Sequence, residues 1–139
     1  FTSRLYEFLY HLCRSYSHQI PSASLTGSQR DLQRVTHVMN WVKVHYPEPL
    51  SLETAADSLA LSKEYFCRLF KKYTGQTFLE YLNDVRTMHL YEDLQNSDET
   101  ITVLMEKNGL SNYKIFMRTF KKLYGSTPQK MRSNRIRHV

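Results

Sequence analysis

Apolar residues recur at three- and four-residue steps along most of the chain, which is the spacing of one face of an α-helix. No stretch alternates β-branched and polar residues for long enough to form a sheet. Residues 2–17 carry one such helical face, and a Ser-rich stretch with a proline and a glycine follows at residues 19–29. We therefore expect an amphipathic helix within residues 1–18, a linker over residues 19–29 and an all-α domain after them.

Caps and stops divide the rest of the chain into two similar parts. In residues 30–76, Ser51 can open a short helix, Ser62 can cap the next one, and Gly75 can end it. A long helix is expected over residues 77–95. Residues 96–133 then repeat the first pattern, with Ser111 expected to restart a helix, and residues 134–139 are expected to form a frayed basic tail.

A seventeen-residue stretch occurs twice, at residues 66–82 and 116–132. Seven positions agree: Phe66/Phe116, Arg68/Arg118, Phe70/Phe120, Lys71/Lys121, Lys72/Lys122, Gly75/Gly125 and Thr77/Thr127. Each copy reads as a helix with a buried aromatic face and a cationic outer face, ended by glycine. A duplicated cationic helix favours a molecule that holds a repeating polyanion at two places, and duplex nucleic acid is such a polyanion.

A short helix, a tight turn and a second helix occur in each part, which is the helix-turn-helix pattern. The small Ala56 allows close packing of the first pair. The expected turns are Leu59-Ala60-Leu61 and Asn108-Gly109-Leu110. Glycine suits the left-handed backbone of such a turn, whereas alanine at position 60 would cost roughly 1 kcal/mol there.

Charge is distributed unevenly along the chain, whose net charge is +6. Residues 80–106 hold seven acids and one base, Arg86, whereas residues 107–139 hold nine Lys or Arg and no acid. A merely solvated surface usually intersperses both signs, so we expect a localised cationic surface in the second part.

The remaining composition bounds the chemistry. Two cysteines and six histidines show no spacing typical of a disulfide framework or a metal site, and no apolar run is long enough to span a bilayer. No nucleophile has a plausible base partner and no glycine loop could cradle phosphates. We expect a cytoplasmic protein that is not an enzyme, with no metal, no cofactor and no membrane contact.

Residues 35–132 resemble the DNA-binding domain of AraC/XylS-type transcription regulators. The residues that carry the resemblance close the second part: Phe120-Lys121, Tyr124-Gly125, Thr127-Pro128 and Arg132. It implies an all-α, seven-helix DNA-binding domain with two helix-turn-helix subdomains joined by a long linker helix, preceded here by a separate amphipathic helix. Each subdomain's second helix would enter one of two adjacent major-groove segments, about 34 Å apart.

Matching this sequence to the family motif implies which side chains touch DNA. Base edges would be contacted by Lys63, Glu64, Cys67, Arg68, Asn112, Tyr113, Lys114, Met117 and Arg118. Phosphates would be contacted by Ser62, Lys71, Lys72, Ser111, Lys121 and Lys122. Arg68 and Arg118 suit guanine, and Asn112 suits adenine. Glu64 could accept from cytosine, and the lysines suit the phosphate backbone.

Several alternatives stay open from the sequence. The two arginines could make structural salt bridges, the lysines could be merely solvated, and Cys67 could be a redox sensor. Met105 stands where the family has a small alanine and Leu110 where it has phenylalanine, a pair that we read as compensated packing. The helix before the linker could pack back on the body.

The resemblance implies a bacterial promoter-binding regulator, more often an activator, that contacts RNA polymerase. A missing N-terminal effector or dimerisation domain would precede it, and residues 1–18 would be the end of that domain. The alternative from another class is a helical protein-interaction module without sequence-specific DNA binding.

Overall fold

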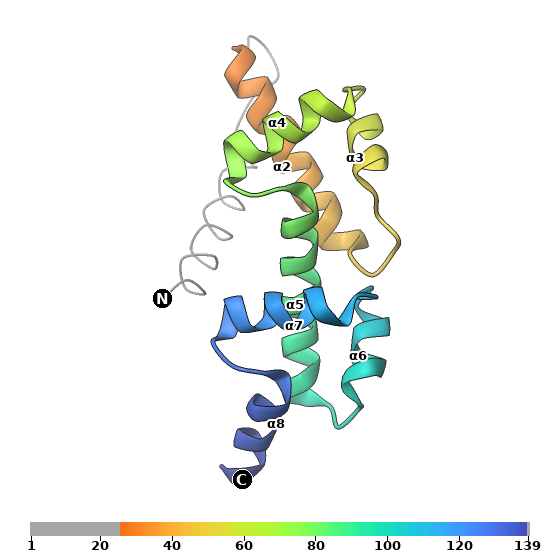
Figure 1. The fold of residues 1–139 in the computed structure, drawn as a ribbon. Helices are drawn as coiled ribbons and strands as arrows, with labels where there is room; N and C mark the ends of the chain where they lie inside the picture. Colours follow the sequence, from red (N-terminus) through yellow and green to blue (C-terminus); the bar gives the residue numbers. More distant parts are fainter. Residues whose placement is uncertain (1–25, 139) are drawn as a thin grey trace. The chain divides into compact units, whose positions relative to one another are not determined.

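The computed structural model describes residues 26–138 of the chain. The helix expected in residues 1–18 and most of the predicted linker lie outside the described residues. Within them the chain forms helices and no strands, as expected for the all-α class (Figure 1). There are seven described helices: α2 (Gly27–His45), α3 (Leu52–Ser58), α4 (Lys63–Thr74), α5 (Phe78–Asn96), α6 (Ile101–Lys107), α7 (Tyr113–Tyr124) and α8 (Pro128–Arg137).

The described chain divides into two compact units. The first unit comprises residues 26–44 and 51–78, and the second comprises residues 45–50 and 79–138. The α2–α3 loop therefore belongs to the second unit, although both helices that it joins lie mainly in the first. The long helix α5 begins in the first unit at Phe78 and continues through the second.

Helix α2 begins at Gly27, earlier than the boundary that the sequence predicted at Arg30. Its start is held by reciprocal hydrogen bonds. The Thr26 N–H donates to Oε1 of Gln29 over 2.9 Å, and the Gln29 N–H donates to Oγ1 of Thr26 over 3.4 Å. This is a capping box, which satisfies amide donors that have no partner within the helix. The last residues of the predicted linker therefore belong to α2.

The core of the first unit is built around three phenylalanines. Phe66 and Phe70 of α4 are fully buried, as their spacing predicted, and Phe78 is almost fully buried. The Phe78 ring meets the other two edge-on, with centroids 5.7 Å from Phe66 and 5.8 Å from Phe70. Small or β-branched residues of α2 and α3 are also buried in this unit: Val35, Val38, Val42, Ala55 and Ala56.

The core of the second unit joins α5, α6 and α7. Its buried cluster comprises Leu90, Leu94, Leu104, Met105, Leu110, Phe116 and Phe120. Met105 and Leu110 both belong to this cluster. That they compensate each other in size stays a prediction. Asn108 is also buried, and its Nδ2 donates to Oδ2 of Asp93 over 2.9 Å and to the Leu104 carbonyl over 2.8 Å.

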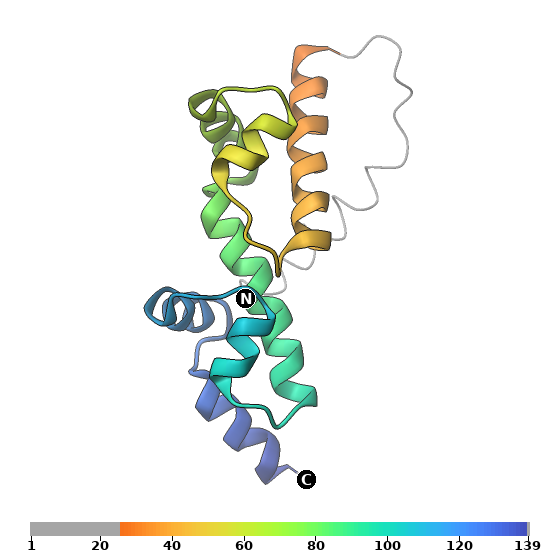
Figure 2. The same cartoon turned by 90° about the vertical axis from the view of Figure 1, so that its right-hand side faces the viewer.

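Helix α8 corrects the expectation of a frayed tail after residue 133. It continues to Arg137 because two of its arginines hold backbone carbonyls at the end of α5 and after it. Arg135 Nη1 donates to the carbonyls of Leu94 and Gln95, each over 2.8 Å. Arg132 Nη2 donates to the Glu99 carbonyl over 2.5 Å. Both views show α8 beside the end of α5 (Figures 1 and 2).

None of the helices within residues 26–138 combines the length and the apolar character that crossing a bilayer requires.

Candidate nucleic-acid interface

The first helix-turn-helix comprises α3, a tight turn and α4. Ser51 caps α3 by accepting from the Thr54 N–H over 3.0 Å, and Ser62 caps α4 by accepting from the Tyr65 N–H over 3.2 Å. Both caps were predicted. Between them Ala60 has a φ of +54°, the only positive value at a non-glycine residue within the described chain. The strained alanine expected in this turn is therefore present.

The second helix-turn-helix has the same turn as the first, but one more residue stands between that turn and the second helix. Turn hydrogen bonds recur at an offset of 49: the Leu61 N–H donates to the Ala56 carbonyl over 3.1 Å, and the Leu110 N–H donates to the Met105 carbonyl over 2.9 Å. Helices α4 and α7, however, start 50 residues apart. The additional residue is Ser111, so this serine has no counterpart in the first unit.

The insertion changes which residue starts the second candidate recognition helix. Ser111 was expected to restart it, but the N-cap is Asn112, whose Oδ1 accepts from the Ile115 N–H over 3.0 Å. The sequence already indicates this insertion, because the two expected turns lie 49 residues apart whereas the repeated helices lie 50 residues apart. The counterpart of Ser62 is therefore Asn112. The side-chain Oδ1 of Asn112 caps α7 in this conformation, and Nδ2 of Asn112 has no hydrogen-bond partner among the described residues.

A close contact fixes the second turn. Gly109 has a φ of +77°, and a Cβ there would stand 2.8 Å from the carbonyl oxygen of Pro47 and 3.0 Å from Nε of Arg86. Arg86 itself donates to the carbonyls of Tyr46 and Glu48, each over 2.6 Å. Burial lowers the pKa of this guanidinium. The second turn thus rests on the loop of residues 45–50, which leaves no space for a side chain at position 109.

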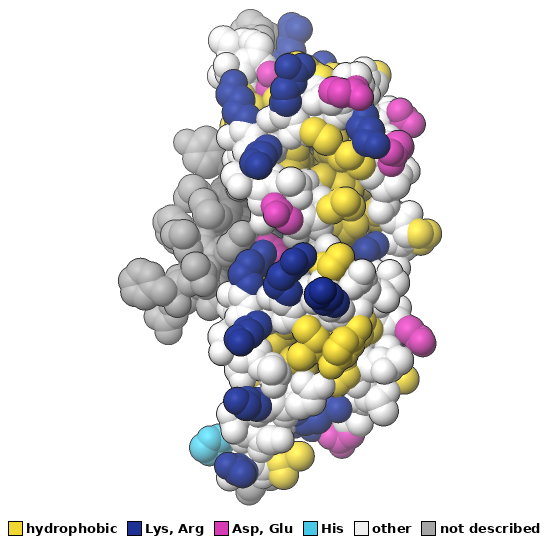
Figure 3. Space-filling view, in the orientation of Figure 1, with side chains coloured by type: hydrophobic (Ala, Val, Ile, Leu, Met, Phe, Trp, Pro, Cys, Tyr) yellow, Lys and Arg dark blue, Asp and Glu magenta, His cyan; other side chains and the backbone are white. Residues whose placement is uncertain are grey.

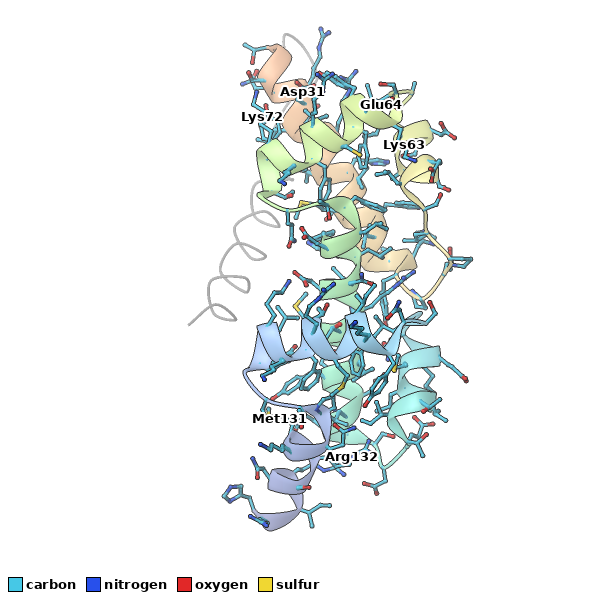
Figure 4. All side chains as sticks on the ribbon, in the orientation of Figure 1. Asp31, Lys63, Glu64, Lys72, Met131 and Arg132 are labelled. Atoms are coloured by element: carbon cyan, nitrogen blue, oxygen red, sulfur yellow. The ribbon has the colours of Figure 1, made fainter. Side chains whose placement is uncertain are left out.

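The outer face of α4 carries four of the predicted base contacts. Lys63, Glu64, Cys67 and Arg68 are all exposed. Lys63 and Glu64 lie at the α3 end of the helix (Figure 4). Arg68 has no ion-pair partner among the described residues, and together with Cys67, Lys71 and Lys72 it lines a shallow, open depression. These groups offer a guanidinium, two ammonium groups and a thiol to a ligand outside the helix.

Lys63 differs from the other cations of α4 because it is already paired. Its Nζ lies 2.7 Å from Oε1 of Glu53, a residue of α3. This hydrogen bond lowers the pKa of the Glu53 carboxyl and raises the pKa of the Lys63 ammonium group. Both side chains are more than half exposed, so the pair is readily exchanged for another partner.

The outer face of α7 is not equivalent to that of α4. Tyr113, Lys114 and Arg118 are exposed, and Arg118 pairs with no acid in residues 26–138. Met117, which aligns with the exposed Cys67, is half-buried and packs against the core cluster of the second unit. Met117 is therefore held partly by its own unit, whereas Cys67 is available to solvent.

The two aligned lysine pairs also differ. Lys71, Lys72 and Lys121 are exposed, and Lys72 lies 5.5 Å from the centroid of the Tyr73 ring. Lys122 instead forms an ion pair with Asp84 of α5, with 2.8 Å between Nζ and Oδ1. Asp84 is buried, with 1% of its side chain exposed. Alignment of the two copies of the repeat does not reveal this role of Lys122. Its partner Asp84 lies 38 positions away and has no counterpart in the first unit.

Charge gathers on the candidate surface of the second unit. Dark blue side chains lie over α7 and continue over α8 (Figure 3). Within the described residues, no group of three or more His, Cys, Asp and Glu side chains is arranged to hold a metal ion. The outer faces of α4 and α7 thus present hydrogen-bond donors and positive charge, which suit phosphates and the acceptor edges of bases.

Comparison with known proteins gives matches over most of the described chain. Residues 55–134 match a family model described as a helix-turn-helix domain. The HTH-type transcriptional activator RhaS of Escherichia fergusonii is 31% identical over 111 residues, which are 80% of this chain and 40% of that protein. The chain spans less than half the length of the curated relatives it matches.

Solved structures also match most of this chain. A transcriptional regulator with an AraC-type DNA-binding domain from Chromobacterium violaceum aligns with a TM-score of 0.66 and 27% identity, over 78% of this chain and 95% of that one. The DNA-binding domain of AdpA, solved in complex with a target DNA, aligns with a TM-score of 0.65 and 25% identity, over 73% of this chain and 91% of that one.

Proposed function

The chain belongs to the AraC-type helix-turn-helix family of DNA-binding domains, and on that premise we propose that it binds promoter DNA sequence-specifically through α4 and α7. The observation that carries the proposal is the repeated arrangement of the two units. In each one a capped second helix follows a tight turn, buries its phenylalanines and exposes an arginine at the same position, Arg68 or Arg118, that has no ion pair within residues 26–138. An exposed guanidinium in that place suits the O6 and N7 acceptors of guanine.

The other contacts are proposed by their chemistry. Glu64 accepts from the amino group of cytosine, and Lys63, Tyr113 and Lys114 contact neighbouring base edges. Lys63 exchanges its exposed partner Glu53 for DNA when it does so. The exposed Cys67 and the half-buried Met117 form the apolar or weakly polar contacts of the two helices.

Phosphate contacts are assigned to three lysines of α4 and α7 that have no acidic partner in the described part of the chain: Lys71, Lys72 and Lys121. Lys122 contributes mainly to the fold because Asp84 already neutralises its charge. Ser62 and Ser111 are exposed, and each hydroxyl can still donate to a phosphate oxygen. We assign Asn112 first to its helix cap, with only its amide NH₂ directed to DNA.

We further propose that α4 and α7 enter two adjacent major-groove segments. The outer faces of the helices differ at Cys67 and Met117, and at Glu64, whose counterpart Lys114 is basic. The bound site is therefore asymmetric, with a different half read by each unit. The name of RhaS, a transcriptional activator, supports activation as the outcome. We also propose a cytoplasmic location, RNA polymerase as a partner and dimerisation through a further domain of the full-length protein.

Selection of bound duplexes from a random DNA pool tests the proposal. We expect enrichment of an asymmetric site with two blocks about one helical turn apart, roughly 10–10.5 base pairs. A gel shift against random duplex separates this proposal from a protein-interaction module, which would bind no DNA. A pool that shows no enrichment after selection contradicts sequence-specific binding.

A further inference from the structure

The C-terminal helix α8 has two faces with different roles. Its inner face comprises Pro128, Met131, Arg132 and Arg135, which are buried or partly buried. Met131 packs against the core cluster, and the two arginines donate to carbonyls at and beyond the end of α5. These residues recur at the three- and four-residue spacing of one helical face, and they hold α8 against the rest of the second unit.

The outer face of α8 comprises Lys130, Ser133, Asn134 and Arg137. All four are exposed, and they follow the same helical spacing on the side away from the carbonyls. Lys130, Asn134 and Arg137 can donate hydrogen bonds outward, whereas the Ser133 hydroxyl already donates to the Gln129 carbonyl over 3.0 Å, and none of the four side chains is acidic. The ammonium group of Lys130 and the guanidinium of Arg137 form no ion pair within residues 26–138, in contrast to Arg135, which pairs with Asp98.

The first turn of α8 adjoins the candidate recognition helix of the same unit. Nε2 of Gln129, in the first turn of α8, lies 3.5 Å from the hydroxyl of Tyr113, the first residue of α7. Dark blue side chains on α7 and α8 are visible together from one side (Figure 3), and Met131 and Arg132 mark α8 in the stick view (Figure 4). The cationic surface of the second unit therefore does not end with α7.

We propose that the outer face of α8 is a further DNA-backbone contact that holds the phosphates flanking the groove segment read by α7. The inference rests on the proposed DNA-binding function and assigns it a second surface. Phosphate is the fitting ligand because a row of flexible donors and full positive charges, with no acid beside them, matches a line of anionic oxygens. We assign phosphates and not base edges to this face because flexible cations two helical turns apart suit separate anionic oxygens of the DNA backbone.

Binding of the DNA backbone also explains why the protein holds the basic helix α8 in a fixed position. Arg135 and Arg132 use their charge within the protein, whereas Lys130 and Arg137 point outward from a helix that those two arginines keep in place. A helix that is already ordered loses little conformational freedom on binding, so its contacts contribute more to affinity than those of a loose tail.

The test compares Lys130→Gln, Arg137→Gln and the double variant with the parent chain, using the duplex selected above. Lys107→Gln is the matched control, because Lys107 is an exposed cation of the same unit outside the proposed surface and already pairs with Glu99. We expect the double variant to reduce the slope of log affinity against log salt by about 1.8, since each phosphate contact contributes about 0.9. At moderate salt this corresponds to roughly a three- to tenfold loss of affinity, with base preference unchanged.

Hydroxyl-radical footprinting locates the effect. The double variant should lose protection only at phosphates that flank the half-site read by α7, while Lys107→Gln keeps the parent footprint. If the double variant matches Lys107→Gln in slope and footprint, the α8 contact is wrong while the proposed function stands. If the parent itself shows no salt-dependent DNA binding, the proposed function fails and this inference fails with it.

Discussion

Lys122 of the second candidate recognition helix forms an ion pair with the buried Asp84 of α5, with 2.8 Å between Nζ and Oδ1. The aligned lysine of the first unit, Lys72, has no acidic partner among the described residues and lies against the ring of Tyr73. The second lysine of the duplicated Lys-Lys pair thus stabilises the fold in the second unit and is left for a ligand in the first.

Removal of the Lys122 side chain should destabilise the protein more than removal of Lys72. Lys122→Ala removes the cation that lies 2.8 Å from the buried Asp84 carboxylate, and we expect a loss of about 1–3 kcal/mol in the free energy of unfolding, less than for a fully buried pair because half of Lys122 is exposed. Lys72→Ala should change it by less than about 0.5 kcal/mol. Urea denaturation of both variants measures the difference, and equal losses would contradict the structural role of Lys122.

Arg68→Ala and Arg118→Ala should each weaken binding to the selected duplex by about 1–3 kcal/mol and relax base preference in one half-site. Each removes an exposed guanidinium that pairs with no acid among the residues that the structure describes, so stability should be almost unchanged. Competition binding against single-base variants of the duplex measures both effects. Variants that bind the selected and random duplexes as the parent does would remove both arginines from base recognition.

The two turns predict opposite responses to exchange of glycine and alanine. Ala60→Gly should stabilise the protein by about 0.5–1 kcal/mol, because it relieves a left-handed alanine. Gly109→Ala should destabilise it by about 2–4 kcal/mol, because strain adds to the collision with the Pro47 carbonyl. Thermal unfolding measures both variants.

Gly125→Ala is the control for the turn variants. Gly125 has a similar φ of +72° but no atom within 4 Å of the added Cβ, so only the backbone strain of about 1 kcal/mol applies. If Gly125→Ala and Gly109→Ala cost the same, the close contact with residues 45–50 is not what excludes a side chain at position 109.

Asn112 can be tested as a cap separately from its contact with DNA. Asn112→Ser keeps an N-cap oxygen, as Ser62 does in the first unit, and should leave stability within about 0.5 kcal/mol of the parent. Asn112→Ala should cost about 1 kcal/mol. Calorimetry gives these values, and base preference measured on Asn112→Ser shows whether the amide reads DNA at all. A stable serine variant with altered preference would assign both roles to Asn112.

The pair of Glu53 and Lys63 predicts a pH response. The pKa of Glu53 is lowered by its hydrogen bond with Lys63, so the contribution of the pair is present at neutral pH and is lost as the pH falls through that lowered pKa. In Lys63→Gln the pKa of Glu53 should return toward its ordinary value. Carboxyl NMR titration of both proteins measures it, and an unchanged pKa would show that the pair is absent in solution.

Local signals in the sequence were enough for the helices, most caps and both glycine stops. Helical spacing identified the buried faces, so Phe66, Phe70, Phe116 and Phe120 were correctly expected in the core. The left-handed turn at Ala60 was also expected, because it depends on a few consecutive residues only. The recognition surface was predicted by the repeat and the family resemblance, and its contacts remain predictions.

Contacts between distant segments decided the rest. The pairing of Lys122 with Asp84 and the seating of Gly109 on residues 45–50 join parts of the chain that are 38 or more positions apart. The order of α8 to Arg137 depends likewise on carbonyls about 40 positions away, which no local pattern reports. Sequence alone therefore determined where most of the described helices lie and which of their residues face inward, because those preferences act over a few neighbours. Only the tertiary structure decided which cations hold the protein together and which are left for a ligand, because that depends on the partner each charge meets after folding.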